Sequence, residues 1–257
     1  MKKLLLGTVG LAGLTMAAPA FAADLPARAP AAYSKAPAMV APVYDWSGFY
    51  AGINGGGGWS HNCWDINNVV GTAVVTAVPE GCHHASGGMA GAQLGYRWQS
   101  ANLVFGVEAQ GDWASLTGSS LSSPAALTSI ITNQTKVDAI GLFTGQIGYA
   151  WNNVLWYVKG GAAVTDDTYS GMLTGFGLTV DSTSGTRWGG VVGTGLEFGF
   201  APLWSVGLEY DHLFMGSRNV NFTVFTVPTR IDSIRQDVDM ATIRVNYHFG
   251  APLVAKY

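Results

Sequence analysis

The sequence predicts an all-β fold, an eight-stranded antiparallel up-and-down β-barrel that spans a membrane, with short periplasmic turns and long extracellular loops. Three observations predict it. Charged residues make up 11% of the chain, against the ~25% usual in soluble domains. Strand-like segments alternate apolar and polar residues. The connections between them alternate in length. A barrel that presents an apolar band to lipid needs few surface charges, whereas a soluble domain needs many.

The start of the chain is typical of an export signal. Lys2 and Lys3 precede a short apolar stretch, and Ala20-Phe21-Ala22 fits a small-x-small cleavage site. A retained anchor helix is the rival interpretation, but glycines interrupt the stretch. We therefore predict a cleavable signal peptide at 1–22, a Pro/Ala-rich periplasmic linker at 23–45, and the barrel at 46–257.

One hairpin shows the strand pattern most clearly. Asn152-Asn153 is a two-residue turn signal between two strand-like runs, with Trp151 before it and Trp156 after it. Away from the turn the residues become small and apolar. Aromatic residues near the turn would lie at the membrane interface, and the small apolar residues of the two strands would lie in the hydrocarbon.

The other strands follow the same pattern along the chain. Each predicted strand is long enough to cross a membrane at a tilt; the predicted strands are 46–59, 87–98, 103–113, 137–151, 154–164, 187–200, 204–212 and 238–249. Short turns are expected at 99–102, 152–153 and 201–203, and long loops at 60–86, 116–136, 165–185 and 213–236. Short turns on one side and long loops on the other are typical of an outer-membrane barrel.

The phase of the charges predicts which face of each strand is inside. Glu108 and Asp112 share a face, and Phe105 and Val107 take the other. A charge facing lipid at the midplane costs about 2–4 kcal/mol, so the charged face is expected to point inward. Eight strands leave room only for side chains, which predicts a plugged salt-bridge network rather than a pore lining. Its predicted members are Arg97, Glu108, Asp112, Lys159, Glu197, Glu209 and Arg244.

The alternation breaks in the fourth strand. Ile140 and Leu142 share a phase with Asp138 and Gln146. Either this strand carries apolar residues inside the barrel, or it contains a β-bulge.

Tryptophans gather near the predicted strand ends, which predicts two interface girdles. At the short-turn side these are Trp46, Trp98, Trp151, Trp156 and Trp204; at the long-loop side they are Trp59, Trp113 and Trp188.

Cys63 and Cys82 are the only cysteines, and an even count in an exported chain predicts a disulfide. It would close a loop of about 20 residues, worth roughly 3 kcal/mol. His61, His83 and His84 lie beside the cysteines, so a metal site is the alternative. These three histidines are also a candidate ligand site in the first long loop.

Several motifs carry a family resemblance. The segments starting at Trp46 (Trp-Ser-Gly-Phe-Tyr-Ala-Gly), Gly145 (Gly-Gln-Ile-Gly-Tyr-Ala-Trp) and Ile243 (Ile-Arg-Val-Asn-Tyr-His-Phe) resemble small outer-membrane β-barrel proteins of alphaproteobacteria. These are porin-like surface antigens related to the opacity-protein superfamily. The resemblance implies an outer-membrane location after export, contact with outer-membrane lipid and lipopolysaccharide, and insertion by the barrel-assembly machinery. That machinery reads an aromatic-ended last strand, for which Phe249 or Tyr257 is the expected end.

Enzymatic function is not expected. Glycine-rich segments lack the Lys-Ser/Thr and the following helix of a phosphate loop. Asp211 and His212 are adjacent in a strand, so they face opposite sides. No catalytic residues, metal ligands or cofactor are therefore assigned, apart from the loop histidines, where hemin or a metal is the alternative. Hemin binding rests only on reports for members of the family.

The expected function is a structural, surface-exposed role in the cell envelope, with the lumen plugged. One alternative is a narrow porin-like channel for small solutes. Another is a surface antigen that binds hemin, metal or host ligands through its loops. A net charge of -3 and the lack of a basic run argue against nucleic acid. The sequence leaves the oligomeric state open.

Overall fold

The structure, a computed structural model, describes residues 44–69, 72–121, 131–174, 176, 178–224 and 227–249. It contains eight strands: β1 Gly48–Val69, β2 Thr72–Ser100, β3 Leu103–Leu121, β4 Ile131–Trp151, β5 Val154–Leu173, β6 Leu178–Ala201, β7 Trp204–Val224 and β8 Val227–His248. Among these residues, no helix has the length and apolar character to cross a membrane. The expected signal peptide, residues 23–43 of the expected linker, and Tyr257 lie outside the described residues.

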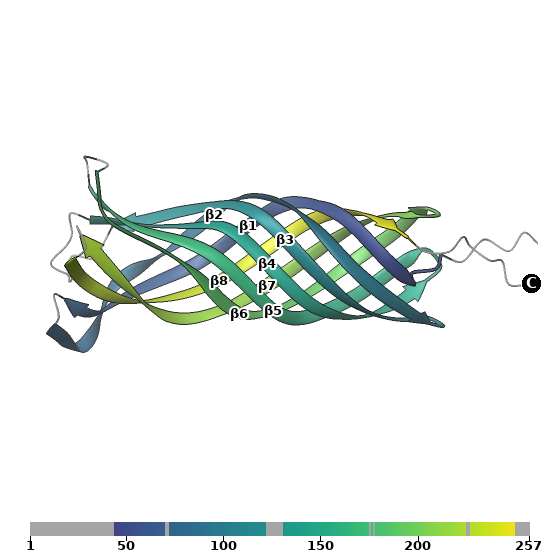
Figure 1. The fold of residues 1–257 in the computed structure, drawn as a ribbon, viewed down its shortest axis with the longest axis horizontal. Coiled ribbons are helices and arrows are strands. Elements are labelled where there is room, and N and C mark those ends of the chain that lie inside the picture. The colour runs from purple at the N-terminus through teal and green to yellow at the C-terminus, as the bar shows by residue number, and fades with distance from the viewer. Residues whose placement is uncertain are drawn as a thin grey trace, which may run out of the picture. The chain divides into compact units, whose positions relative to one another are not determined.

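The eight strands form one closed antiparallel barrel, which confirms the predicted fold class (Figure 1). Each strand pairs with the next, and β1 pairs with β8 to close the ring. Three tight turns join β2 to β3, β4 to β5 and β6 to β7. At the Asn-Asn turn, Asn152 has a φ of 55°, a left-handed conformation that asparagine tolerates well.

The strands extend well beyond their predicted ends on the side opposite the tight turns. β1 and β2 remain paired as far as Val69 and Thr72, inside the segment expected to be the first long loop. β4 and β5 likewise remain paired to Ile131 and Leu173. The predictions stopped short because they followed apolar alternation. A strand outside the membrane keeps its hydrogen bonds but no longer needs an apolar outer face.

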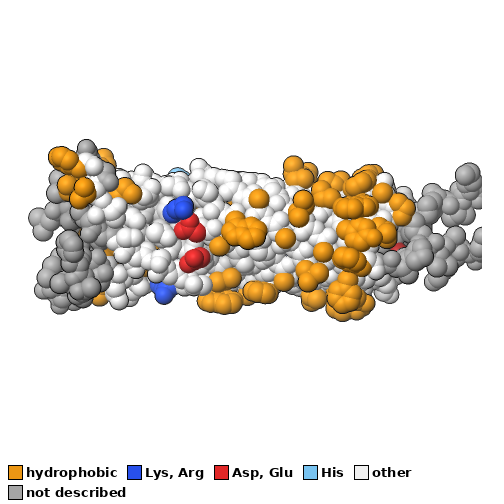
Figure 2. Space-filling view, turned by 45° about the horizontal axis from the view of Figure 1, so that its top comes forward, with side chains coloured by type: hydrophobic (Ala, Val, Ile, Leu, Met, Phe, Trp, Pro, Cys, Tyr) orange, Lys and Arg blue, Asp and Glu red, His pale blue; other side chains and the backbone are white. Residues whose placement is uncertain are grey.

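The outer surface carries an apolar belt near the tight turns. We use this name for the outward-facing exposed side chains of the strands, which include Phe49, Ile53, Leu94, Phe105, Val107, Phe143, Ile147, Val158, Val192, Leu196, Phe198, Leu208 and Ile243. Figure 2 shows hydrophobic side chains gathered over this half of the barrel surface and few over most of the other half. The belt is the surface expected to face hydrocarbon.

The inner face is filled by side chains in successive layers. Nearest the tight turns lie aromatic and aliphatic residues, then the charged residues, and then an apolar layer. Glycines make room for the largest rings. A Cβ at Gly195 would lie 2.3 Å from the ring of Tyr157, and one at Gly95 would lie 2.4 Å from the ring of Tyr50. Both positions therefore need glycine because an aromatic ring from the neighbouring strand lies across them.

β4 shows both features that the broken alternation suggested. Ile140 and Leu142 are buried inside the barrel. The register with β5 shifts between Val137 and Ala139. This bulge puts Val137 and Ile140 on the inner face together and leaves Asp138 half-exposed.

If the apolar belt faces lipid, a charged side chain placed in the belt should destabilise the protein more than the same side chain placed outside it. We expect Leu94→Arg, near the middle of the belt, to lower the free energy of unfolding by about 2–4 kcal/mol. Urea unfolding in phosphatidylcholine vesicles would measure it. Ser119→Arg is the control, because Ser119 faces outward on the extension of β3 past the belt. Equal costs for the two variants would contradict the proposed lipid-facing surface.

Candidate functional site

The tight-turn end of the lumen is covered by residues that precede β1. Trp46 is 0% exposed and packs with Tyr44. Its backbone N–H donates to Gln99 Oε1 at 2.8 Å. The prediction that Trp46 belongs to an interface girdle was therefore wrong. Gly48 has a φ of 113°, and this turn directs the preceding residues into the lumen.

Above this aromatic group lies the first ion pair of the lumen. Arg97 Nη2 is 2.8 Å from Glu197 Oε2, and both side chains are fully buried. The guanidinium also lies over the Tyr50 ring, 4.3 Å from its centroid. Glu197 accepts further hydrogen bonds from Asn246 Nδ2 at 2.9 Å and from Ser205 Oγ. The carboxylate and the guanidinium are thus paired where neither side chain is exposed, although Arg97 Nη1 has no hydrogen-bond partner among the described residues.

A second group of charges is centred on Arg244 and Lys159. Arg244 bonds both Glu108 and Glu209. Lys159 Nζ lies 2.7 Å from Glu209 Oε1 and 3.2 Å from Asp211 Oδ1. These residues come from strands on different sides of the ring, so the network crosses the lumen. Six of the seven predicted network residues make these ion pairs.

The seventh residue, Asp112, makes none of these ion pairs but joins the network through Gln110, which also accepts from Lys159 Nζ at 3.4 Å. The Asp112 Oδ2 atom accepts a hydrogen bond from Gln110 Nε2 at 3.0 Å. Asp211 was not among the predicted members of the network, although it faces the lumen and lies beside Lys159. The tyrosines Tyr50 and Tyr157 were also missed, and they donate to Glu108 and Glu209.

An apolar layer covers the network on the side away from the tight turns. Every strand from β2 to β8 contributes a buried residue to it; the members are Ala85, Met89, Leu116, Val137, Ile140, Leu142, Ala163, Val191, Leu213, Met215, Val238 and Met240. Beyond it, Asp167, Tyr169 and Gln236 form a buried hydrogen-bonded group. The luminal side chains therefore change from charged to apolar to polar along the barrel.

The three loop histidines separate into two environments on the β1–β2 hairpin. His83 points inward, where its ring nitrogens lie 3.1 Å from Thr135 Oγ1 and 3.2 Å from Ser120 Oγ. Burial, with smaller contributions from His61 and His84, lowers the pKa of His83 to about 4. His61 and His84 face outward and lie opposite each other in the register, with ring centroids 4.7 Å apart.

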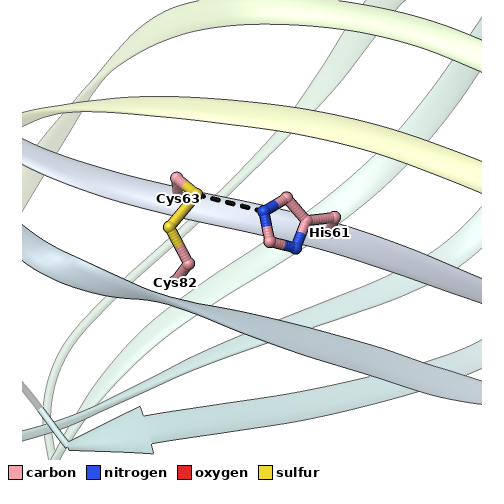
Figure 3. A group of neighbouring side chains, drawn as sticks. All are labelled: His61, Cys63 and Cys82. Carbon is pink, nitrogen blue, oxygen red and sulfur yellow. Dashed lines mark hydrogen bonds between the residues drawn. A yellow bond between two sulfur atoms is a disulfide. The ribbon is translucent and has the colours of Figure 1, made fainter.

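The disulfide lies beside the outer histidine pair. Cys63 and Cys82 are bonded and also face each other in the β1–β2 register. His61 Nε2 is 3.3 Å from Cys63 Sγ, as Figure 3 shows. The donor atoms of His61, Cys63 and Cys82 all lie within 4.8 Å of one another. The His61–His84 pair and the Cys63–Cys82 pair thus occupy adjacent positions on one face of the hairpin.

The remaining tryptophans assigned to the girdles have exposed side chains on the outer surface. Trp98, Trp151, Trp156 and Trp204 lie close to the tight turns, and Trp59, Trp113 and Trp188 lie toward the other edge of the belt.

A serine and a histidine meet in the lumen without forming a catalytic set. Ser205 Oγ is 2.9 Å from His248 Nε2, but Glu197 Oε1 accepts from the same hydroxyl and lies 3.5 Å from the same ring nitrogen. The other ring nitrogen, Nδ1, has no hydrogen-bond partner among the described residues that could orient the imidazole. All three are buried. Asp211 faces the lumen, while His212 faces outward and bonds Asp239 Oδ1 at 2.7 Å. Neither group has the nucleophile, base and orienting residue that a hydrolase needs.

The closed ring, the apolar belt and the filled polar interior define an outer-membrane β-barrel protein. The chain matches the outer membrane protein beta-barrel domain family over residues 10–249, and it belongs to that family. The protein is therefore an outer-membrane protein, as the sequence predicted.

Known proteins of similar sequence include outer-membrane proteins of Brucella species. The 31 kDa outer-membrane immunogenic protein of Brucella melitensis is 29% identical, over 97% of this chain and 100% of its own length. The 25 kDa outer-membrane immunogenic protein of Brucella abortus is 28% identical, over 94% and 96%. Among solved structures, the outer membrane protein OprG from Pseudomonas aeruginosa aligns with a TM-score of 0.52 at 12% identity, covering 79% of this chain and 97% of its own. That likeness supports the fold alone.

The luminal ion pairs predict strong coupling between their partners. We expect Arg97→Met to lower the free energy of unfolding by about 3–5 kcal/mol, because Glu197 would remain charged and buried. Adding Glu197→Gln should recover part of this loss. Urea unfolding in phosphatidylcholine vesicles, read as a double-mutant cycle, measures the coupling.

Lys136→Gln is the matched control. Lys136 pairs with Asp138 at 2.5 Å, but their side chains are 47% and 34% exposed. Losing this surface pair should cost less than about 1 kcal/mol. Strictly additive losses for Arg97→Met and Glu197→Gln would contradict the interaction.

Proposed function

We propose that this protein is a structural, non-enzymatic component of the outer membrane whose lumen is closed and whose extended hairpins are exposed outside the cell. The observation that carries the proposal is the stack of luminal layers. An ion-paired layer and an apolar layer follow each other, and both consist of side chains with almost no exposure. A solute would have to break buried ion pairs and then cross an apolar barrier.

The absence of an enzymatic role is part of the same proposal. Its support is that Ser205, His248 and Glu197 are buried in the lumen, and that the outward-facing His212 bonds Asp239 without a serine or cysteine nucleophile among its described hydrogen-bond partners. Contact with outer-membrane lipid and lipopolysaccharide, and insertion by the barrel-assembly machinery, follow from the location. The oligomeric state is left open.

If the lumen is closed, the protein should not conduct ions across a bilayer. In planar bilayers, the folded parent should give no stable conductance steps. A variant that truncates the apolar layer, Leu142→Ala/Met240→Ala, should also stay closed, because the ion-paired layer remains. Reproducible steps from the parent would favour the narrow-channel alternative and end this proposal.

A second candidate function, metal binding at the outer hairpin, has its own support. With the disulfide formed, His61 and His84 remain as an imidazole pair, which suits Cu²⁺, Ni²⁺ or Zn²⁺. Reduction by a phosphine converts the disulfide to two thiols while the phosphine becomes its oxide, taking oxygen from water. The Cys2His2 set so formed is typical of zinc sites. Hemin is less favoured, because His83 points into the barrel.

Zinc titration of the detergent-folded protein tests this candidate. We expect weak binding in the oxidised state, tighter binding after phosphine reduction, and loss of binding in His61→Ala and His84→Ala. His83→Ala is the control, because it lies next to His84 in the chain but faces inward. If His61→Ala and His84→Ala bind zinc as the parent does, the hairpin is not a metal site.

A further inference from the structure

On the extended side, the regular pairing of β6 with β7 ends earlier than the pairing of the neighbouring strands. The described pairing of these strands ends at Gly190 and Phe214. The flanking pairs continue much further: β5 and β6 to Leu173 and Leu178, and β7 and β8 to Val224 and Val227. Residues 178–189 and 215–224 thus face each other across a seam, where Arg187 Nη1 donates to the Gly216 carbonyl at 3.5 Å and Arg218 Nη1 donates to the Thr186 carbonyl. The two arginine side chains therefore take the place of a backbone ladder here, and they lie where a ligand could reach the strand edges.

Two cavities lie along this seam, and both include Arg187 and Arg218. One, of about 200 Å³, reaches inward to Tyr169 and is lined by Thr183, Ser184, Gly185 and Asn219 among others. The other, of about 380 Å³, is lined by Thr186, Trp188, Met215 and Ser217 as well as the two arginines. None of the described lining residues is acidic. The seam therefore combines two guanidinium groups with hydroxyl donors.

Arg187 is a buried cation with unused hydrogen-bonding capacity. Its side chain is 3% exposed. Nη1 donates to the carbonyl of Ile234 at 3.2 Å, and Nε lies 3.9 Å from Asp167 Oδ2. Nη2 has no hydrogen-bond partner. A buried donor without a partner costs about 1–3 kcal/mol, more for a charged group, so an acceptor in the cavity would relieve that cost.

Arg218 supplies the second cation from the other side of the seam. It is exposed on β7, and its Nη1 donates to the carbonyl of Thr186 on β6. Trp188, two residues further along β6, is 65% exposed at the edge of the apolar belt. The two arginines therefore lie just outside the belt, at the level where the charged headgroups of the outer leaflet are expected.

From this geometry we propose that the β6–β7 seam is a binding site for a phosphate ester, held by Arg187 and Arg218. Arginine binds phosphate through two parallel hydrogen bonds, and two arginines from opposite sides of the seam would enclose one phosphate group. The phosphate can belong to a lipopolysaccharide headgroup or be free in solution. The proposal rests on the outer-membrane location and is independent of whether the lumen conducts.

Binding to the full chain, folded in a phosphate-free non-ionic detergent, tests the proposal by calorimetry. One arm titrates inorganic phosphate, another lipopolysaccharide, and a third dephosphorylated lipopolysaccharide. We expect Arg187→Gln and Arg218→Gln each to weaken binding of the phosphorylated ligand about tenfold. Lys136→Gln, which removes an exposed cation from β4, should bind as the parent does.

The three titrations distinguish the possible ligands. If both inorganic phosphate and lipopolysaccharide bind, the site recognises the phosphate group itself. If phosphorylated lipopolysaccharide binds and inorganic phosphate does not, the site recognises the lipid headgroup. Equal affinity for dephosphorylated lipopolysaccharide, no binding in any arm, or unchanged affinity in Arg218→Gln overturns the proposal. Arg187 also contacts Asp167, so its variant must first show the folded band on an unheated gel. Arg218 is exposed, and its variant carries the test alone if Arg187→Gln does not fold.

Discussion

Pairing of charges inside the lumen is the interaction on which the rest of the barrel depends. Hydrocarbon on the outside forces charged side chains of the membrane-crossing strands to point inward. Eight strands leave no room there for enough water to solvate them. Arg244 resolves this by joining Glu108 of β3 to Glu209 of β7. The same bonds that pair these buried charges also hold distant strands at fixed positions around the ring.

The sequence was sufficient to predict the face of most charged strand residues but not their partners. Because side chains alternate between the two faces of a strand, Arg97 and Glu197 can be assigned to the inner face without any tertiary information. Nothing in that period says that a residue of β2 meets one of β6, because the contact depends on the closed ring and its stagger. The β4 bulge is similar. The broken phase at Ile140 revealed an irregularity, but only the register with β5 located it at Val137.

Trp46 and the strand ends were mispredicted for different reasons. Trp46 stands beside a short turn, where a girdle residue is expected, but a left-handed glycine two positions later turns the chain beneath the barrel. Ser47-Gly48 is the one local signal that could have suggested this. The strand ends were missed because outside the membrane the outer face is polar, and hydrophobic alternation then carries no information. Hydrogen-bond pairing continues where that pattern stops.

The extended hairpin of β1 and β2 has a consequence for recognition at the cell surface. Its residues alternate between solvent and the barrel interior, so that His84 is exposed while the adjacent His83 is buried. A macromolecule approaching from outside, such as an antibody, meets only every second side chain of each strand, next to those of the neighbouring strand. A synthetic peptide with the same sequence displays both faces. Antibodies raised against such a peptide would in large part be directed at side chains that the folded protein hides.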